Sequence, residues 1–164
     1  MSDRPAPKLP LTAEEKQNLR ASKISLQAIK GLDAAELAEI LGSTPERAAH
    51  LRALAQFQSI PSIGPRIAER VAALGYGTLD ELKLLDGPAL LEQLENHYGY
   101  WEDPCLEDAL WCMVHHANHP GSEKSWFDFT DARKAYRQAH GYPETRPKKA
   151  WHEVKAEERR KDVQ

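Results

Sequence analysis

The feature that most constrains this chain is a break between two stretches of helical sequence. Apolar residues recur at helical spacing up to Ile60 and again from Ile67, but the run PSIGP at residues 61–65 separates them. A proline inside a helix loses a backbone hydrogen bond and clashes with the preceding turn, and a glycine there costs about 1 kcal/mol relative to alanine. The sequence therefore predicts two helices joined by a tight turn at these five residues.

Capping residues, glycines and prolines divide the rest of the chain into short segments with apolar residues at helical spacing. Asp33 as N-cap and Gly42 as a stop predict a helix over Ala34–Leu41. The next helix begins either with a capping box that opens at Ser43 or with Thr44, which precedes a proline.

Further helices are expected where a capping residue or a proline precedes a run of helical spacing, at residues 79–85, 88–97, 104–117 and 132–140. A capping box at Thr78 opens the first of them, and Thr130 caps the last. No run shows the sustained alternation of β-branched residues that a half-buried strand would show. The sequence therefore predicts an all-α fold, a compact bundle of short helices with short loops.

The length of the chain fits one small domain with polar ends. Of its 164 residues 41% are hydrophobic, slightly below the ~45–50% usual in globular domains, so we expect a modest core. Three prolines among charged residues predict a flexible lead at residues 1–11, and a charged segment with few apolar residues predicts a mobile tail at residues 141–164, helical in part. The helical domain is expected between them, at residues 12–140.

Charge and cysteine content limit the partners and the compartment. The chain has 22 basic and 25 acidic residues, a formal net charge of −3, so any contact with nucleic acid must come from a local basic patch. Two cysteines are too few for a disulfide framework, which favours a reducing compartment. No apolar segment resembles a signal peptide or a membrane span, so we expect a cytoplasmic protein without membrane contact.

The predicted turn has the residue types of an anion site. The N-terminus of the helix that follows it presents backbone N–H groups, and the helix dipole favours negative charge there. Gly64 lets the backbone approach a ligand closely, and Arg66 and Arg70, one helical turn apart, add cationic side chains. The alternative is an ordinary helix–helix turn whose arginines are simply solvated.

The stretch IPSIGPRIAERVAALGYGTLDEL, residues 60–82, resembles a helix-hairpin-helix motif. The matching pairs are Ile60-Pro61, Ile63-Gly64, Pro65-Arg66 and Ile67-Ala68. This resemblance implies binding to the phosphate backbone of DNA without sequence specificity, with phosphates held by the amides of Ile63 and Gly64 and by the Arg66 side chain. Ser62 replaces the first glycine of the motif, and a positive φ at that position would disfavour serine.

A wider resemblance covers Phe57 to Ala117. This region, in which Asp103-Pro104-Cys105 opens a later helix, is similar to the small bacterial helix-hairpin-helix proteins labelled "pathogenicity locus". In that family a serine at the position of Ser62 is ordinary, and the label assigns no chemistry. The earlier break at residues 29–33 is either a second, degenerate hairpin packed against the first or an ordinary helix–helix turn.

A group of cysteines and histidines lies in and after the helix expected at residues 104–117. Cys105, Cys112 and His116 fall near one face, with His119 beyond them, and zinc accepts this mixture of sulfur and nitrogen ligands. Structural zinc sites usually take paired ligands from two chain segments, whereas these come from one. Buried cysteines, and histidines that suit the C-terminal end of a helix, are therefore the stronger interpretation, and we expect no metal or other cofactor.

No pattern typical of an enzyme occurs, since the chain has no phosphate loop, nucleophile elbow or zinc-protease motif, and we expect neither catalysis nor a small-molecule substrate. The favoured function is binding to the DNA backbone through Ser62, Ile63, Gly64, Arg66 and Arg70. The alternative is a protein-interaction module that keeps the hairpin as a scaffold. The two differ in whether the arginines and the amides face solvent together or are paired with acidic side chains.

Residues outside the turn are given supporting roles. Basic residues of the tail, beginning with Arg146, would add salt-sensitive contacts to DNA. Trp101, Trp126 and Trp151 are assigned to the core or to helix packing rather than to base stacking.

Overall fold

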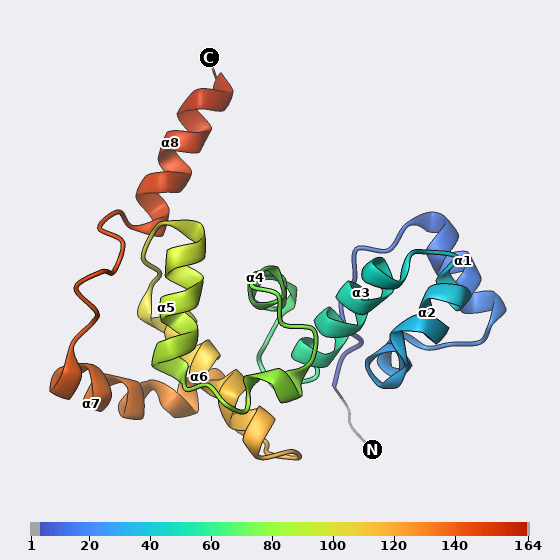
Figure 1. Cartoon of the computed structure of the whole chain (residues 1–164), viewed down its shortest axis with the longest axis horizontal. Coiled ribbons are helices and arrows are strands. Elements are labelled where there is room, and N and C mark those ends of the chain that lie inside the picture. Colours follow the sequence, from blue (N-terminus) through green and yellow to red (C-terminus); the bar gives the residue numbers. More distant parts are fainter. Residues whose placement is uncertain (1–3, 164) are drawn as a thin grey trace.

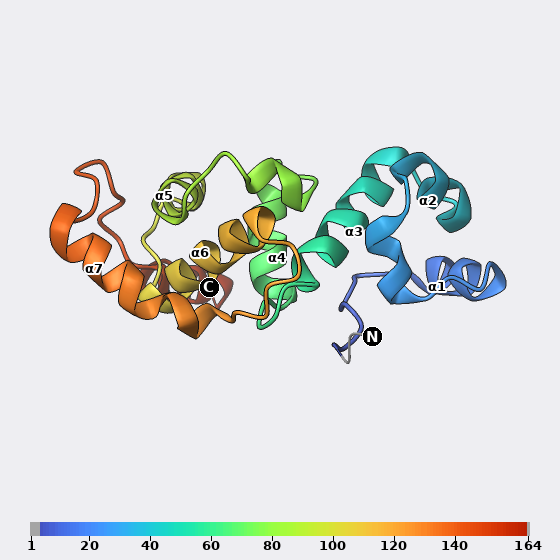
Figure 2. The same cartoon turned by 90° about the horizontal axis from the view of Figure 1, so that it is seen from below.

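The computed structural model describes residues 4–163. Figures 1 and 2 show that this part of the chain consists of helices joined by loops. Within it, the β-type pairing is limited to an isolated bridge between Trp101 and Ala150, so the predicted all-α fold is confirmed. None of the helices between residues 4 and 163 has the length and apolar content needed to cross a membrane. In chain order the helices are α1 (Ala13–Ala21), η1 (Leu26–Gly31), α2 (Ala34–Leu41), α3 (Pro45–Gln58), α4 (Pro65–Ala73), η2 (Leu79–Leu82), α5 (Gly87–Tyr98), α6 (Pro104–Asn118), η3 (Trp126–Phe129), α7 (Thr130–His140) and α8 (Trp151–Val163), where η marks a 3₁₀ helix.

Two groups of buried apolar side chains form the core, and α3 belongs to both. The first group joins α1, η1, α2 and the N-terminal part of α3, where Leu37 and Leu51 are fully buried. The second joins the C-terminal part of α3 to α4, η2, α5 and α6, and it includes Phe57 and Leu110. In Figure 1, α3 accordingly runs from the N-terminal helices to α4 in the middle of the molecule. The turn after α3 is therefore carried on a helix that both cores hold.

The boundaries of α2 and the start of α3 follow local capping chemistry. Asp33 accepts hydrogen bonds from two N–H groups of the first turn of α2, and Gly42 ends this helix with a left-handed φ of 70°. The predicted bounds of α2 are confirmed. Of the two predicted starts for the next helix, the structure has the one at Thr44, whose hydroxyl accepts a hydrogen bond from the N–H of Arg47 at 3.2 Å.

Two predicted caps are wrong. Thr78 makes no capping hydrogen bond, and the helix after it is only the short η2; the N–H of Leu79 donates to the side chain of Gln56 on α3 at 2.9 Å instead. Thr130 is the first residue of α7 rather than its cap, and its hydroxyl donates to the buried Asp108 carboxylate on α6 at 2.8 Å. At both positions a contact with another helix replaces the predicted capping contact: Gln56 accepts the N–H next to Thr78, and Asp108 accepts the hydroxyl of Thr130.

Arginines from the last third of the chain pair with buried carboxylates on α5 and α6. The nitrogen–oxygen distances are 2.7 Å for Arg133 with Asp108, 2.9 Å for Arg137 with Glu107 and 2.8 Å for Arg146 with Glu95. Removal of one partner from a buried ion pair costs about 3–5 kcal/mol, because the other charge is then left unpaired. These pairs fasten α7 and the segment after it to the core.

The segment predicted as a tail begins with residues that contact the helices. The Arg146 guanidinium lies 3.7 Å from the centroid of the Tyr142 ring, in addition to its pair with Glu95. This arginine is therefore not free for the DNA contact predicted for it. In contrast, α8 has no buried residue and projects from the rest of the molecule in Figure 1. The mobility of the tail and the proposed domain boundaries stay predictions.

The break at residues 29–33 joins the 3₁₀ helix η1 to α2 through the extended residue Leu32. The segment before this break is thus one short 3₁₀ helix rather than a regular α-helix. Its interpretation as a second, degenerate hairpin stays a prediction.

Candidate functional site

The predicted turn lies between the end of α3 at Gln58 and the start of α4 at Pro65. Ser62 has a φ of 69°, in the left-handed region that costs a residue other than glycine about 1–2 kcal/mol. Ile63 is 4% exposed, and its N–H donates to the Ile60 carbonyl oxygen at 3.2 Å. The turn is therefore anchored in the core, and the Ile63 amide that the sequence resemblance assigned to a phosphate is engaged inside the turn.

The N-terminus of α4 is open to a ligand. Gly64 is its N-cap, with extended backbone (φ −94°, ψ −177°), and no side chain caps the first turn. A methyl group at Gly64 would meet no other atom within 4 Å, so a ligand can come close to the backbone here. Because Pro65 has no N–H, the first amides that the helix presents are those of Arg66 and Ile67.

The two arginines of α4 have different environments although they lie one turn apart. Arg66 is exposed and makes no hydrogen bond or ion pair with another residue of the described range 4–163. The Arg70 side chain is 11% exposed, pairs with the Glu102 carboxylate and donates to the Tyr100 hydroxyl at 2.8 Å. Its guanidinium also lies 4.7 Å from the centroid of the Tyr98 ring. Arg66 is thus available to an anion, whereas Arg70 is occupied by an acidic side chain.

Electrostatics keep Arg70 charged inside this pair. Burial by itself disfavours the charged guanidinium, but the hydrogen bond and the negative charge of Glu102 outweigh it, so the pKa of Arg70 is raised above its ordinary value. Glu102 in turn is 4% exposed and has its charge balanced by Arg70. The pair therefore joins α4 to the start of α6 as a structural link.

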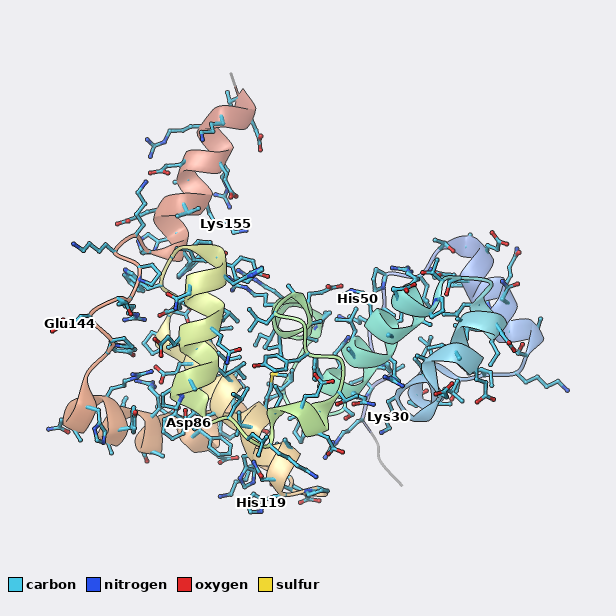
Figure 3. The ribbon with its side chains drawn as sticks, in the orientation of Figure 1. Lys30, His50, Asp86, His119, Glu144 and Lys155 are labelled. Atoms are coloured by element: carbon cyan, nitrogen blue, oxygen red, sulfur yellow. The ribbon has the colours of Figure 1, made fainter. Side chains whose placement is uncertain are left out.

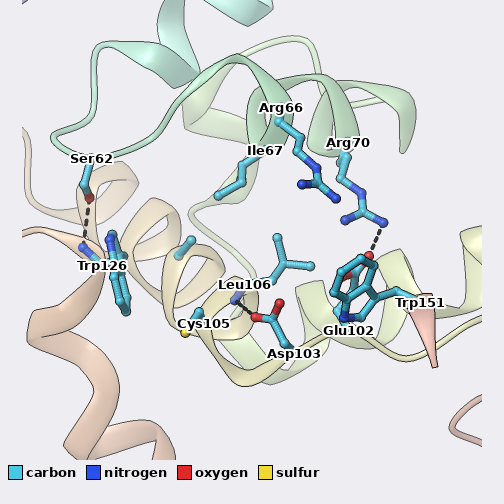
Figure 4. Close-up of a pocket in the computed structure, with 11 residues that line it drawn as sticks. Ser62, Arg66, Ile67, Arg70, Glu102, Asp103, Cys105, Leu106, Trp126 and Trp151 are labelled. Atoms are coloured by element: carbon cyan, nitrogen blue, oxygen red, sulfur yellow. Dashed lines mark hydrogen bonds and ion pairs between the residues drawn. The ribbon is translucent and has the colours of Figure 1, made fainter. Parts of the chain in front are cut away.

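A cleft of about 270 Å³ lies beside the turn, between α4 and the N-terminal end of α6. Figure 4 shows Trp126 and Trp151 at its two ends, with Arg66 projecting into the space between them. The backbone N–H of Trp126 donates to the Ser62 hydroxyl at 3.0 Å, across 64 positions of the chain. The serine that departs from the hairpin motif therefore supplies an acceptor that glycine lacks. Through Ser62 and Arg66 the turn and the cleft form one continuous site.

The two tryptophans of the cleft are site residues that sequence reasoning missed. Trp126 packs against the core, as the sequence predicted, but it and Trp151 are half-buried and also line the cleft, a role that the sequence did not assign to them. A tryptophan isolated in a charged segment was a usable sign for Trp151. No local pattern could have shown that Trp126 lies beside Ser62.

The cysteines and histidines serve mainly to hold the segment that follows α6. Cys112 is buried, its Sγ lies 3.6 Å from the Lys124 carbonyl oxygen, and burial raises the pKa of its thiol to about 12. His116 donates from Nε2 to the same carbonyl at 2.8 Å, and burial lowers the pKa of its ring. Cys105 is exposed in the cleft, and His119 lies exposed at the end of α6 (Figure 3). Within residues 4–163 no three such side chains are placed to hold one metal ion.

The fold and the site together define a small all-α protein with an open helix N-terminus beside an aromatic cleft. The chain belongs to the family described as "Pathogenicity locus", whose family model matches residues 50–135, from α3 through the turn and into α7. The predicted pathogenicity-locus family is therefore confirmed, while the helix-hairpin-helix character of the turn stays a prediction. No curated protein and no solved structure matches the chain. Because the family description names neither a ligand nor a reaction, function has to be argued from the site.

Proposed function

We propose that this protein binds the phosphate backbone of DNA without sequence specificity, at the turn between α3 and α4 used as a helix-hairpin-helix. The observation that carries the proposal is the environment of Arg66, an exposed guanidinium without a partner in the described chain, next to a helix N-terminus without a side-chain cap. A phosphate at this place would accept hydrogen bonds from the amides of Gly64, Arg66 and Ile67. The Arg66 side chain would add a charged, bidentate contact.

The protein groups available to bind a phosphate differ from those expected from the sequence. The amide of Ile63 is engaged with Ile60, and Arg70 is engaged with Glu102, so neither contributes to the proposed phosphate site. Ser62 contributes through the shape of the turn and through its contact with Trp126. The proposed site therefore holds one phosphate rather than several, and it is expected to bind weakly.

A further cation lies close to Arg66. A second hollow of about 360 Å³ is lined by Arg66 and by Lys155 of α8, which Figure 3 shows on the first half of that helix. The acidic residues Glu69 and Glu102 also line it, and Glu102 is neutralised by its pair with Arg70. The Lys155 ammonium is exposed and would meet a neighbouring phosphate of a strand held at the turn. Such a local pair of cations supports backbone binding in a chain whose net charge is −3.

The second candidate is a protein-interaction module that uses the turn as a scaffold. The pairing of Arg70 with Glu102 favours it, because one of the two arginines expected to face solvent is neutralised inside the protein. The exposed state of Arg66 favours the first candidate. The two candidates are separated by direct binding measurements.

The experiment is fluorescence-anisotropy titration of a labelled DNA duplex with the full chain, at low and at physiological salt. The test variant is Arg66→Glu, and the matched control is Arg20→Glu, which makes the same charge change at an exposed arginine on α1. A charged hydrogen bond contributes about 1.5–3 kcal/mol, so we expect Arg66→Glu to weaken binding about 10- to 150-fold and the control to weaken it far less. Equal effects of the two variants, or no binding at low salt either to the duplex or to one of its separated strands, would refute the proposal.

A further inference from the structure

We infer that the cleft beside the turn holds one unpaired nucleobase of the strand whose phosphate lies at α4. The preferred ligand is then single-stranded DNA or a duplex with an unpaired stretch, rather than a continuous duplex. This inference rests on the proposed function, because the phosphate and the base share Arg66. It adds a substrate class that the family description does not contain.

The lining of the cleft suits a flat, aromatic group with an anion attached. Trp126 and Trp151 stand at its two ends, and Ile67 and Leu106 line it between them (Figure 4). The indole N–H of neither tryptophan donates to another residue in the range 4–163, so both remain available to the edges of a base. Arg66 projects into the same space and can stack on a base or bind its phosphate.

The size of the cleft limits what can enter it. Its volume of about 270 Å³ lies just below the ~300–1,000 Å³ typical of pockets for drug-sized ligands. It therefore has room for one planar ring system and not for a stacked base pair. A base of a continuous duplex would have to leave its stack to reach the tryptophans.

Ser62 connects the base site to the phosphate site. Its hydroxyl accepts a hydrogen bond from the backbone N–H of Trp126 at 3.0 Å, while its own backbone forms the turn in the left-handed region. A glycine would adopt this φ at a lower conformational cost, but it has no hydroxyl to accept the hydrogen bond from Trp126. We assign Ser62 as a positioning residue, which sets Trp126 at a fixed place relative to the phosphate-binding amides.

Phe127 extends the aromatic surface beyond the cleft. It is 61% exposed, and its ring packs edge-on against Trp126 with the centroids 5.8 Å apart. None of the residues of η3 is buried: Trp126 packs against the core with one part of its ring, whereas Phe127 is largely exposed beside it. A second base could stack on Phe127, because stacking on aromatic side chains tolerates any base.

A peptide is a less suitable occupant than a nucleotide. The cleft combines aromatic faces with a cation and an open helix N-terminus, and a nucleotide supplies a flat ring and an anion in one unit. Of the two carboxylates at its margin, Glu102 is paired with Arg70. Asp103 caps α6 by accepting a hydrogen bond from the N–H of Leu106 at 3.0 Å, and the dipole of that helix offsets part of its negative charge.

The test measures how tightly the full chain binds two labelled single strands of equal length. One is an oligo-thymidine, and the other is an abasic strand with the same phosphates. The measured quantity is the ratio of the two Kd values. Stacking of one base contributes about 1–3 kcal/mol, so we expect the intact strand to bind about 5- to 150-fold more tightly. We expect Trp126→Leu and Trp151→Leu to bring the ratio toward one, and Trp111→Leu, which does not line the cleft, to leave it unchanged. Far-UV circular dichroism and thermal melting check that each variant folds.

The outcomes separate this inference from the proposed function. Equal affinities for the two strands in the wild type, with binding lost in Arg66→Glu, would overturn the base site and leave the phosphate site standing. Absence of binding to either strand and to the duplex at low salt would overturn both. Binding of a short poly-glutamate peptide that depends on Trp126 and Trp151, with no binding of either strand, would identify a protein partner and overturn the inference. Recovery of the ratio in Trp151→Phe would support an aromatic contact.

Discussion

Substitution of each arginine of α4 by methionine tests whether Arg70 is buried in an ion pair while Arg66 is exposed. Arg66 and Arg70 are both basic residues on the same short helix, so local sequence gives them the same role. In the structure Arg66 is exposed, while the Arg70 side chain is 11% exposed and paired with Glu102, which is 4% exposed. Methionine keeps much of the length of the side chain and removes only the charge and the hydrogen bonds.

The expected magnitudes follow from burial. Loss of Arg70 would leave the Glu102 carboxylate in the core without its cation, and breaking a buried pair in this way costs about 3–5 kcal/mol. The Tyr100 hydroxyl would also lose its donor. Surface substitutions away from such contacts usually change stability by less than about 0.5 kcal/mol, so Arg66→Met is expected to be nearly neutral.

Chemical denaturation with urea, followed by circular dichroism, measures both variants. We expect Arg70→Met to lower the free energy of unfolding by at least about 2.5 kcal/mol more than Arg66→Met does, from the difference of the two estimates. The double variant Arg70→Met with Glu102→Gln removes the unpaired charge and should recover part of the loss. Equal effects of the two single variants, or no recovery in the double variant, would show that Arg70 and Glu102 are not a buried pair in solution.

Three further predictions concern stability and reactivity. Gly87→Ala would place a Cβ inside the indole of Trp111, so thermal melting should show that the free energy of unfolding falls by about 1–3 kcal/mol. The exposed Cys105 should react with a thiol reagent in the folded protein, and the buried Cys112, with its pKa raised to about 12, only after unfolding. Glu15 pairs with Arg47, and the hydrogen bond from this arginine lowers the pKa of the Glu15 carboxyl. The pair therefore stabilises the folded protein fully above the unfolded pKa of about 4.3, and this stabilisation is lost as pH falls through the lower folded pKa. The stability advantage of the wild type over Glu15→Gln should shrink between pH 6 and about pH 3.

The elements that could be predicted from sequence are those that local chemistry determines. The bounds of α2 depend on Asp33 and Gly42, which act within one turn of the helix ends, and they agree with the structure. Thr78 and Thr130 fit the same local rules, but neither acts as predicted. The contacts that decide these two positions come from α3 and α6, and a pattern of neighbouring residues contains no information about them.

The candidate site shows the same limit of prediction from local sequence. The turn and the N-terminus of α4 follow from the residues around them, whereas the exposure of Arg66 and the pairing of Arg70 do not. The occupation of Arg70 depends on Glu102, and the place of Trp126 depends on Ser62, both through contacts between distant parts of the chain. Sequence spacing on one helix could therefore identify candidate donors but could not show which of them the fold had already paired.

The most direct test of the central claim is the salt dependence of DNA binding in Arg66→Gln. Each phosphate neutralised on double-stranded DNA contributes about −0.9 to the slope of log K against log salt concentration. If Arg66 binds one phosphate, the slope for the variant should be smaller than that for the wild type by about this amount, with weaker binding at every salt concentration. Binding with an unchanged slope would place the phosphate contacts elsewhere, and it would contradict a phosphate site at Arg66 and the turn before it.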